Sequence, residues 1–220
     1  MRRFFYNNGL SVVMFALFFF SLIGQSLTGL QEYNQDQQEH RQPTVGFVEY
    51  LGTGHFIEAT FENWESEFLQ MSAFIVLTVF LYQKGSSESK EPGRKEPVDV
   101  ELSPSAISED APWPVRRGGW VLKLYENSLS LVFLLLFLAS LLLHAFGGAE
   151  EYNQDQLAHG GQAVSMFGYM ATSRFWFESF QNWQSEFFSI GAMVVLTIFL
   201  RQKGSPESKP VYATHIETED

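Results

Sequence analysis

Two carboxylates and an imidazole at four-residue spacing occur twice in the chain, and these residue types can bind a metal ion. The six residues are Glu32, Asp36, His40, Glu151, Asp155 and His159. Residues four positions apart lie on one face of a helix, so each trio would form a single polar stripe. Oxygen and imidazole ligands suit divalent cations, so the six residues are candidate metal ligands if the two stripes face each other.

The same trios fit a second interpretation, a solvated helix face or a capped turn. The strings HRQPT and HGGQA follow directly and end any helix at the histidine. A basic residue also stands at one further matched position, as His55 in the first copy and Arg174 in the second. Because these two residues differ, the sequence suggests no shared chemistry for them.

A second set of polar residues lies at the edge of the apolar segments. Its members are Gln25, Glu67, His144, Glu186, Asn63 and Asn182, with Gln70 nearby. Helical rise places the first four at one depth, roughly 22 Å from the opposite helix ends. Ionisable groups at membrane depth usually face a bundle interior or a water-filled cavity, so this layer is a candidate cofactor-binding site. In the alternative, the two glutamates lie at the lipid headgroups and His144 extends to the interface.

The elements that position these residues come from an internal repeat. A shift of 119 residues aligns Asn8–Lys90 with Asn127–Lys209 without a gap, and 39 of the 83 positions are identical. This level of identity indicates that a unit of two helices has been duplicated.

Each copy contains two apolar runs. The four runs are Leu10–Leu30, Phe68–Leu81, Leu129–Phe146 and Phe187–Leu200. The first run of each copy is long enough to cross a bilayer, which takes about 20 helical residues. The second runs are shorter, but the aromatic residues before them recur at helical spacing, so we extend these helices back to Phe61 and Phe180.

Two alternatives to membrane helices are disfavoured by the sequence. The string SLSLVFLLLFLASLLLHAF has no polar face, unlike a helix of a soluble bundle. Residues 1–28 resemble a cleaved signal peptide, but the matching run in the second copy is internal. We therefore expect the first run to be retained as a helix.

The basic residues predict the orientation. Residues 1–9, 82–128 and 201–220 hold 12 of the 14 lysines and arginines, which places them and both termini in the cytoplasm. The sequence thus predicts an all-α membrane protein of four transmembrane helices, arranged as two tandem helical hairpins in a parallel repeat. The predicted parts are a membrane unit at 1–85, a flexible cytoplasmic linker at 86–118, a second membrane unit at 119–204 and a disordered acidic tail at 205–220.

The most specific string in the chain is GHFIEATFENWESEFLQMSAFIVLTVFLYQKGSSESK, which has a partner in the second copy. It resembles a family of small bacterial multi-pass membrane proteins that is catalogued only as a domain of unknown function. The resemblance covers most of the chain apart from the linker and the tail. It implies a location in the bacterial inner membrane and supplies no substrate, cofactor or active site.

Composition narrows the functional classes. The net charge of −11 argues against nucleic acid as a partner, and the absence of cysteine excludes thiolate chemistry. No catalytic motif is present, so the sequence leaves an enzymatic role undecided and does not favour one. We expect an accessory protein that contacts the bilayer and binds a membrane-protein partner or forms a homo-oligomer. The alternatives are a small oligomeric transporter or channel for cations or protons, and a protein that binds a metal or redox cofactor. No cofactor is firmly implied.

Overall fold

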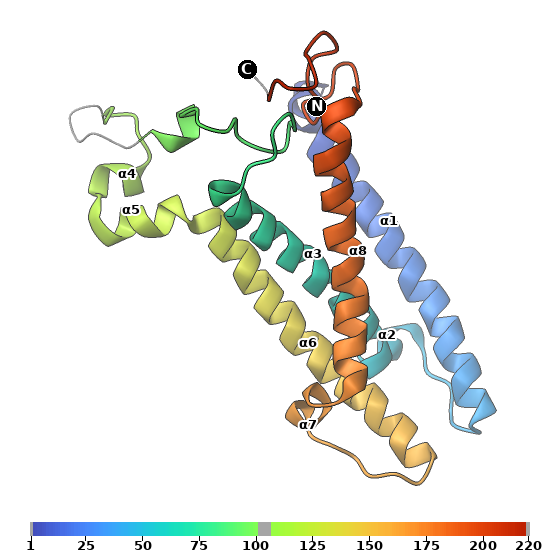
Figure 1. Ribbon diagram of the computed structural model, residues 1–220. Coiled ribbons are helices and arrows are strands. Elements are labelled where there is room, and N and C mark those ends of the chain that lie inside the picture. The colour runs from blue at the N-terminus through green and yellow to red at the C-terminus, as the bar shows by residue number, and fades with distance from the viewer. Residues whose placement is uncertain (1, 101–106, 219–220) are drawn as a thin grey trace. The chain divides into compact units, whose positions relative to one another are not determined.

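The computed structural model describes residues 2–100 and 107–218, and these residues form helices and no strand (Figure 1). The prediction of an all-helical chain is therefore confirmed for the described residues. The helices are α1 (Arg2–Glu39), α2 (Phe47–Tyr50), α3 (Gly54–Phe80), η1 (Pro97–Asp99), α4 (Trp113–Arg117), α5 (Gly119–Glu126), α6 (Ser128–Ala158), α7 (Met166–Met170) and α8 (Ser173–Phe199).

The long helices extend well beyond the apolar runs. α1 continues through the polar hexapeptide EYNQDQ to Glu39, and α6 continues through the second hexapeptide to Ala158. Both helices stop at matching positions of the repeat, where Arg41 and Gly160 have positive φ angles of 59° and 75°. A left-handed residue just past the last turn is a common helix terminator, which explains why both helices end just before the histidine of each trio.

Two of the described helices are candidate membrane spans by their length and composition. α1 and α6 are long and apolar enough to cross a membrane. α3 and α8 each have 27 residues, but neither meets the same criterion over the part of the chain that the structure describes. Acidic and amide side chains such as Glu62 and Gln181 lower the hydropathy of their first halves.

The chain divides into two compact units, which are described separately here. Unit 1 contains Met1–Phe61 and Leu142–Trp176, and unit 2 contains Glu62–Leu141 and Phe177–Asp220. Each unit draws on both copies of the repeat, whereas the predicted parts of the chain follow its linear order. Residues 101–106 of the predicted linker and 219–220 of the predicted tail lie outside the described residues.

In unit 1, each long helix holds a buried tyrosine from the short helix that follows it. Tyr50 of α2 and Tyr169 of α7 are almost completely buried. A Cβ atom at Gly29 would collide with the Tyr50 ring, and one at Gly148 would collide with the Tyr169 ring. Glycine at these matching positions therefore lets each short helix lie close against its long helix.

A second close approach in unit 1 joins α3 to α6. Gly54, the first residue of α3, lies so close to Gly147 of α6 that a Cβ at either position would meet backbone atoms of the other helix. Nearby, the Gln25 amide of α1 donates to the hydroxyl of Thr60 on α3 at 3.3 Å. These contacts hold α1, α3 and α6 together in unit 1.

In unit 2, α3, α6 and α8 pack through aromatic and hydroxyl side chains. The rings of Phe68 and Phe133 lie 6.2 Å apart, and the Ser72 hydroxyl donates to the Ser130 carbonyl at 3.2 Å. The Trp183 indole on α8 donates to Glu65 on α3 at 2.9 Å, and Glu65 is fully buried.

The predicted tail makes definite contacts over its described residues. The Arg201 guanidinium donates to the carbonyl of Ala213 at 3.1 Å, and the Lys209 amine donates to the carbonyl of Glu217 at 2.7 Å. The His215 ring also bonds to the Ile198 carbonyl at 3.0 Å. These bonds fold the segment back toward the end of α8.

Candidate functional site

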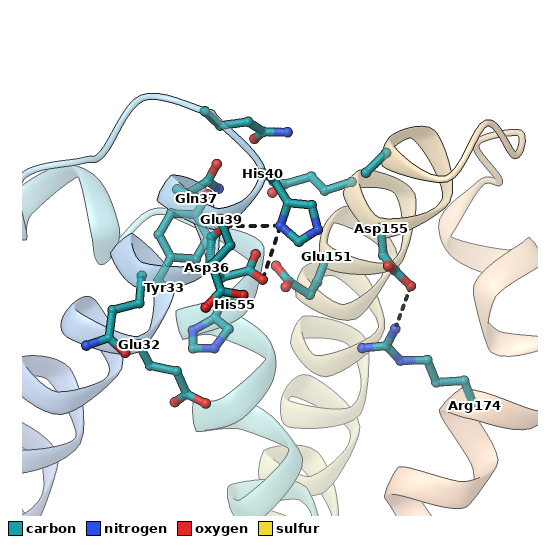
Figure 2. A pocket seen from close by; sticks show the side chains of 14 residues that line it. Glu32, Tyr33, Asp36, Gln37, Glu39, His40, His55, Glu151, Asp155 and Arg174 are labelled. Atoms are coloured by element: carbon teal, nitrogen blue, oxygen red, sulfur yellow. Dashed lines mark hydrogen bonds and ion pairs between the residues drawn. The ribbon is translucent and has the colours of Figure 1, made fainter.

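A cavity of about 520 Å³ lies in unit 1, between the polar ends of α1 and α6 (Figure 2). Its wall consists almost entirely of charged and polar side chains. The lining residues are Glu32, Tyr33, Gln35, Asp36, Gln37, Glu39, His40, Gln42, His55, Glu151, Gln154, Asp155, Ala158 and Arg174. Five carboxylates therefore share the wall with one guanidinium and two imidazoles, so the acidic groups outnumber the basic ones.

The two polar trios converge at this cavity. Five of their six members line it, and only His159 is outside the lining set. The rings of His40 and His159 lie 6.4 Å apart, so the missing member is close to its counterpart. The repeat has thus brought two copies of one helix end together. Whether the six residues bind a metal ion stays a prediction.

Each histidine is oriented by the aspartate one helical turn before it. His40 Nδ1 lies 3.0 Å from the Asp36 carbonyl oxygen and 3.3 Å from its Oδ1. His159 Nδ1 makes the same two contacts with Asp155, at 2.9 Å and 3.1 Å. Both partners are acceptors, so Nδ1 is the donor in each ring, and in the neutral form of the ring Nε2 holds the lone pair.

The asparagine of each hexapeptide clamps the loop that follows. The Asn34 amide donates to the Val45 carbonyl at 3.0 Å and accepts from the Val45 amide at 2.8 Å. Asn153 makes the matching pair with Val164, at 2.9 Å and 2.7 Å. These bonds return each loop to its long helix and so set the entry into α2 and α7.

The Tyr33 side chain forms part of the wall beside the acids, and its ring contacts that of Tyr50. The Tyr33 ring lies 5.8 Å from that of Tyr50, whose hydroxyl is 3.0 Å from His55 Nδ1. Burial, followed by the nearby Glu32 and Glu151 carboxylates, raises the pKa of Tyr50 from 10.0 to about 12. Its hydroxyl therefore stays protonated at neutral pH and can donate to His55.

Glu151 is the acid that is most enclosed by the wall. Its Oε2 atom is shielded from solvent and has no hydrogen-bond partner among the described residues. The positive groups that act on it are His55 and Arg174, and Arg174 also forms an ion pair of 3.7 Å with Asp155. A shielded carboxylate oxygen without a donor carries a desolvation cost that no hydrogen bond offsets.

The sequence does not predict a shared role for His55 and Arg174, because the two residues differ, yet both line the cavity. They occupy equivalent positions in the two copies, and both side chains can carry positive charge. The shared positive charge is the feature of the sequence that could have identified this pair. A comparison of residue identities misses it. Each approaches the ends of α1 and α6 from the first turn of its helix.

The residues of the predicted polar layer belong to different units. Gln25 and His144 are in unit 1, and the other four, Glu67, Glu186, Asn63 and Asn182, are in unit 2. His144 is fully buried and stacks on Phe175, with ring centroids 4.9 Å apart.

In unit 2, Glu67 and Glu186 lie close enough to interact electrostatically. The Asn182 amide donates to the Glu178 carbonyl at 3.2 Å, and the Asn63 carbonyl accepts from Ser66 at 2.8 Å. Each of the six residues therefore belongs to one of the two units. That the six form one polar layer stays a prediction.

Two buried acids were not among the sequence candidates. Glu58 accepts a hydrogen bond of 3.1 Å from the Tyr169 hydroxyl, and its carboxylate lies within 4.8 Å of a ring nitrogen of His144. Glu65 accepts from Trp183 in unit 2. Their counterparts in the second copy are Phe177 and Gln184. Because neither acid is repeated, a comparison of the two copies does not identify Glu58 or Glu65 as a candidate.

Comparison with known proteins supplies a family without a function. A family described as a domain of unknown function (DUF6766) matches residues 1–220, so the chain belongs to that family. No curated protein matches the chain. No solved structure matches it either.

Proposed function

We propose that this member of the DUF6766 family is an accessory protein of the bacterial inner membrane that binds a cationic group in its outward-facing cavity. In this proposal the chain crosses the bilayer four times, with both termini in the cytoplasm. The ligand is an ammonium or guanidinium group, carried either by a small solute or by a basic side chain of a partner protein. The observation that carries the proposal is the convergence of five carboxylates on one cavity.

The apolar surface supports membrane insertion. α1 exposes large side chains such as Phe15 and Phe20, and α6 exposes Leu129 and Leu135. Contiguous apolar surface of this kind is rare on soluble proteins and matches a lipid contact. α6 is about 46 Å long, which exceeds a ~30 Å hydrocarbon core and lets its polar end project into water.

Four spans remain the interpretation that best fits both copies. The apolar halves of α3 and α8 are short, but Trp64 and Trp183 precede them at positions suited to the interface. Twelve of the 14 basic residues then fall on one side of the membrane, which supports a cytoplasmic location for that side. The cavity would face the opposite side.

The size and chemistry of the cavity support a cationic ligand. Its volume of about 520 Å³ lies within the ~300 to 1,000 Å³ typical of small-molecule sites. Clefts lined by one sign of charge raise the local concentration of ions of the other sign. Within this wall, Glu151 is the most enclosed of the five acids, so its carboxylate is the acceptor whose substitution tests the proposal.

Isothermal titration of the purified full-length protein with putrescine tests the proposal. We expect saturable binding, and we expect Glu151→Gln to weaken it about tenfold or more because a hydrogen bond to a charged group is lost. Glu49→Gln is the matched control, since Glu49 is exposed on α2 and does not line the cavity.

A lysine-rich peptide in the same titration identifies the source of the cation. Tighter binding of the peptide than of putrescine would indicate a protein partner, and the reverse a free solute. If neither ligand binds, or if Glu151→Gln binds both as the wild type does, the proposed function is wrong.

Two alternatives make different predictions. An oligomeric transporter would move cations or protons across proteoliposomes, whereas an accessory protein would bind the cation without flux. A redox-cofactor protein would show a visible absorption spectrum after gentle purification from native membranes. Flux in liposomes that Glu151→Gln abolishes would favour the transporter over the accessory role.

A further inference from the structure

We infer that the mouth of the cavity holds a second, separate site for a transition-metal ion, with the Nε2 atoms of His40 and His159 as its two protein ligands. This inference goes beyond the proposed binding of an organic cation. It assigns a separate chemistry to the two histidines, one from each copy of the repeat.

The hydrogen bonds of the two rings have the pattern of metal-binding histidines. A histidine that binds a metal usually donates its other ring N–H to a carboxylate or a backbone carbonyl, which fixes the tautomer and the ring orientation. His40 does both through Asp36, and His159 does both through Asp155. Both Nε2 atoms are thus left as acceptors for a metal ion.

The separation of the rings is close to that of two imidazoles on one ion. A metal lies about 2.0 to 2.1 Å from a ligating imidazole nitrogen, and therefore roughly 3.2 Å from the ring centroid. Two rings on one ion then have centroids about 5.2 Å apart at a tetrahedral angle and about 6.4 Å apart only when the two bonds are collinear. The observed separation of His40 and His159 is 6.4 Å, so the two exposed rings must close by about 1 Å to share a tetrahedral ion.

The ligand type selects the class of metal. Imidazole nitrogen suits zinc, copper and nickel, whereas magnesium and calcium prefer oxygen ligands. The side chains of His40 and His159 are 43% and 71% exposed, so an ion can enter from solvent and keep water in its other coordination positions. Nearby carboxylates in the wall add electrostatic attraction for the ion.

A purely structural interpretation of the same contacts also exists. A histidine in the last turn of a helix can bond to a free carbonyl and interact favourably with the helix dipole. That interpretation explains each Asp–His pair separately. It leaves the approach of the two rings to the packing of the repeat, and it predicts no metal binding.

Titration of the chelator-treated full-length protein with Zn²⁺ tests the inference. We expect one ion per chain, and we expect His40→Asn and His159→Asn each to lower the affinity at least tenfold. The double variant should lose less affinity than the sum of the two single losses, because both ligands serve one ion. His215→Asn is the matched control, since His215 lies in unit 2 at the end of α8.

Substitution of the orienting acids gives a second readout. Asp36→Asn and Asp155→Asn should lower the Zn²⁺ affinity about tenfold, the usual effect of removing an orienting carboxylate. With Co²⁺ as the probe, nitrogen ligation should give a visible spectrum that both histidine variants lose. The melting temperature without metal, measured on each variant, identifies any loss of affinity that results from unfolding.

Several outcomes would overturn the inference. They are the absence of saturable Zn²⁺ binding, histidine variants that bind as the wild type does, and single variants that halve the stoichiometry without changing the affinity. The last result would mean two independent sites with one histidine each. Glu151→Gln should change the Zn²⁺ affinity less than threefold, so failure of this site and failure of the amine site are distinguishable.

Discussion

Tyr50 carries a phenol that its surroundings keep protonated. Burial, then the carboxylates of Glu32 and Glu151, raise its pKa to about 12, whereas the unfolded chain has the ordinary value of 10.0. The folded protein therefore holds this proton at pH values where the unfolded chain has lost it. Its contribution to stability is complete below about pH 10 and is lost as the pH rises to about 12.

We predict that Tyr50→Phe removes a phenolate that appears near pH 12 in a near-ultraviolet absorbance titration. The free energy of unfolding of the variant should also fall less steeply between about pH 10 and about pH 12 than that of the wild type. Tyr212→Phe is the control, because Tyr212 is 90% exposed. If the absorbance change near pH 12 is the same in Tyr50→Phe as in the wild type, the raised pKa does not belong to Tyr50.

The spacing of Glu32, Asp36 and His40 was sufficient to predict a shared helix face, because a helix places every fourth residue on one side. The sequence did not predict that the first trio approaches the second, because that approach depends on how the two helices pack. It predicted only that a metal site requires it. The clamp formed by Asn34 was not predictable, because its partner Val45 lies across a loop whose path the sequence leaves open.

At the scale of the elements, glycines determine how α2 and α7 are held in unit 1. Gly29 and Gly148 are the points at which the buried tyrosines approach the long helices. We predict that Gly29→Ala and Gly148→Ala each destabilise the protein by about 1 to 3 kcal/mol, because the added methyl group overpacks a filled site. Thermal unfolding in detergent measures the loss.

Gly24→Ala is the matched control for these variants, since nothing lies within 4 Å of a Cβ at that position of α1. Replacing glycine by alanine inside a helix without a clash should be neutral or stabilising by about 0.5 to 1 kcal/mol. Equal melting temperatures for Gly24→Ala and Gly29→Ala would contradict the close packing described for Tyr50.

The sequence identified the four long helices but not the lengths of all of them. Apolar periodicity marks only the part of a helix that contacts lipid or protein, so the polar ends of α1 and α6 had no such signal. α2 and α7 have four and five residues, too few to show a period. Their existence follows from the burial of Tyr50 and Tyr169, which is a tertiary effect.

For the whole molecule, the proposed orientation places the cavity on one side of the membrane and both termini on the other. The chain contains no cysteine, so a single introduced cysteine reports its own exposure. We predict that Ser205→Cys, just after the end of α8, reacts with a membrane-impermeant maleimide only after the cells are permeabilised. Reaction of this residue in intact cells would contradict the proposed orientation.

The central claim, a cation held in an outward-facing cavity, is tested most directly by labelling Gln35→Cys in intact cells. Gln35 lines the cavity and is exposed. The account predicts that an impermeant maleimide labels this cysteine from outside and that the amine or peptide that binds the purified protein slows the labelling. Labelling that requires permeabilised cells, or a rate that this ligand leaves unchanged at saturation, would contradict it.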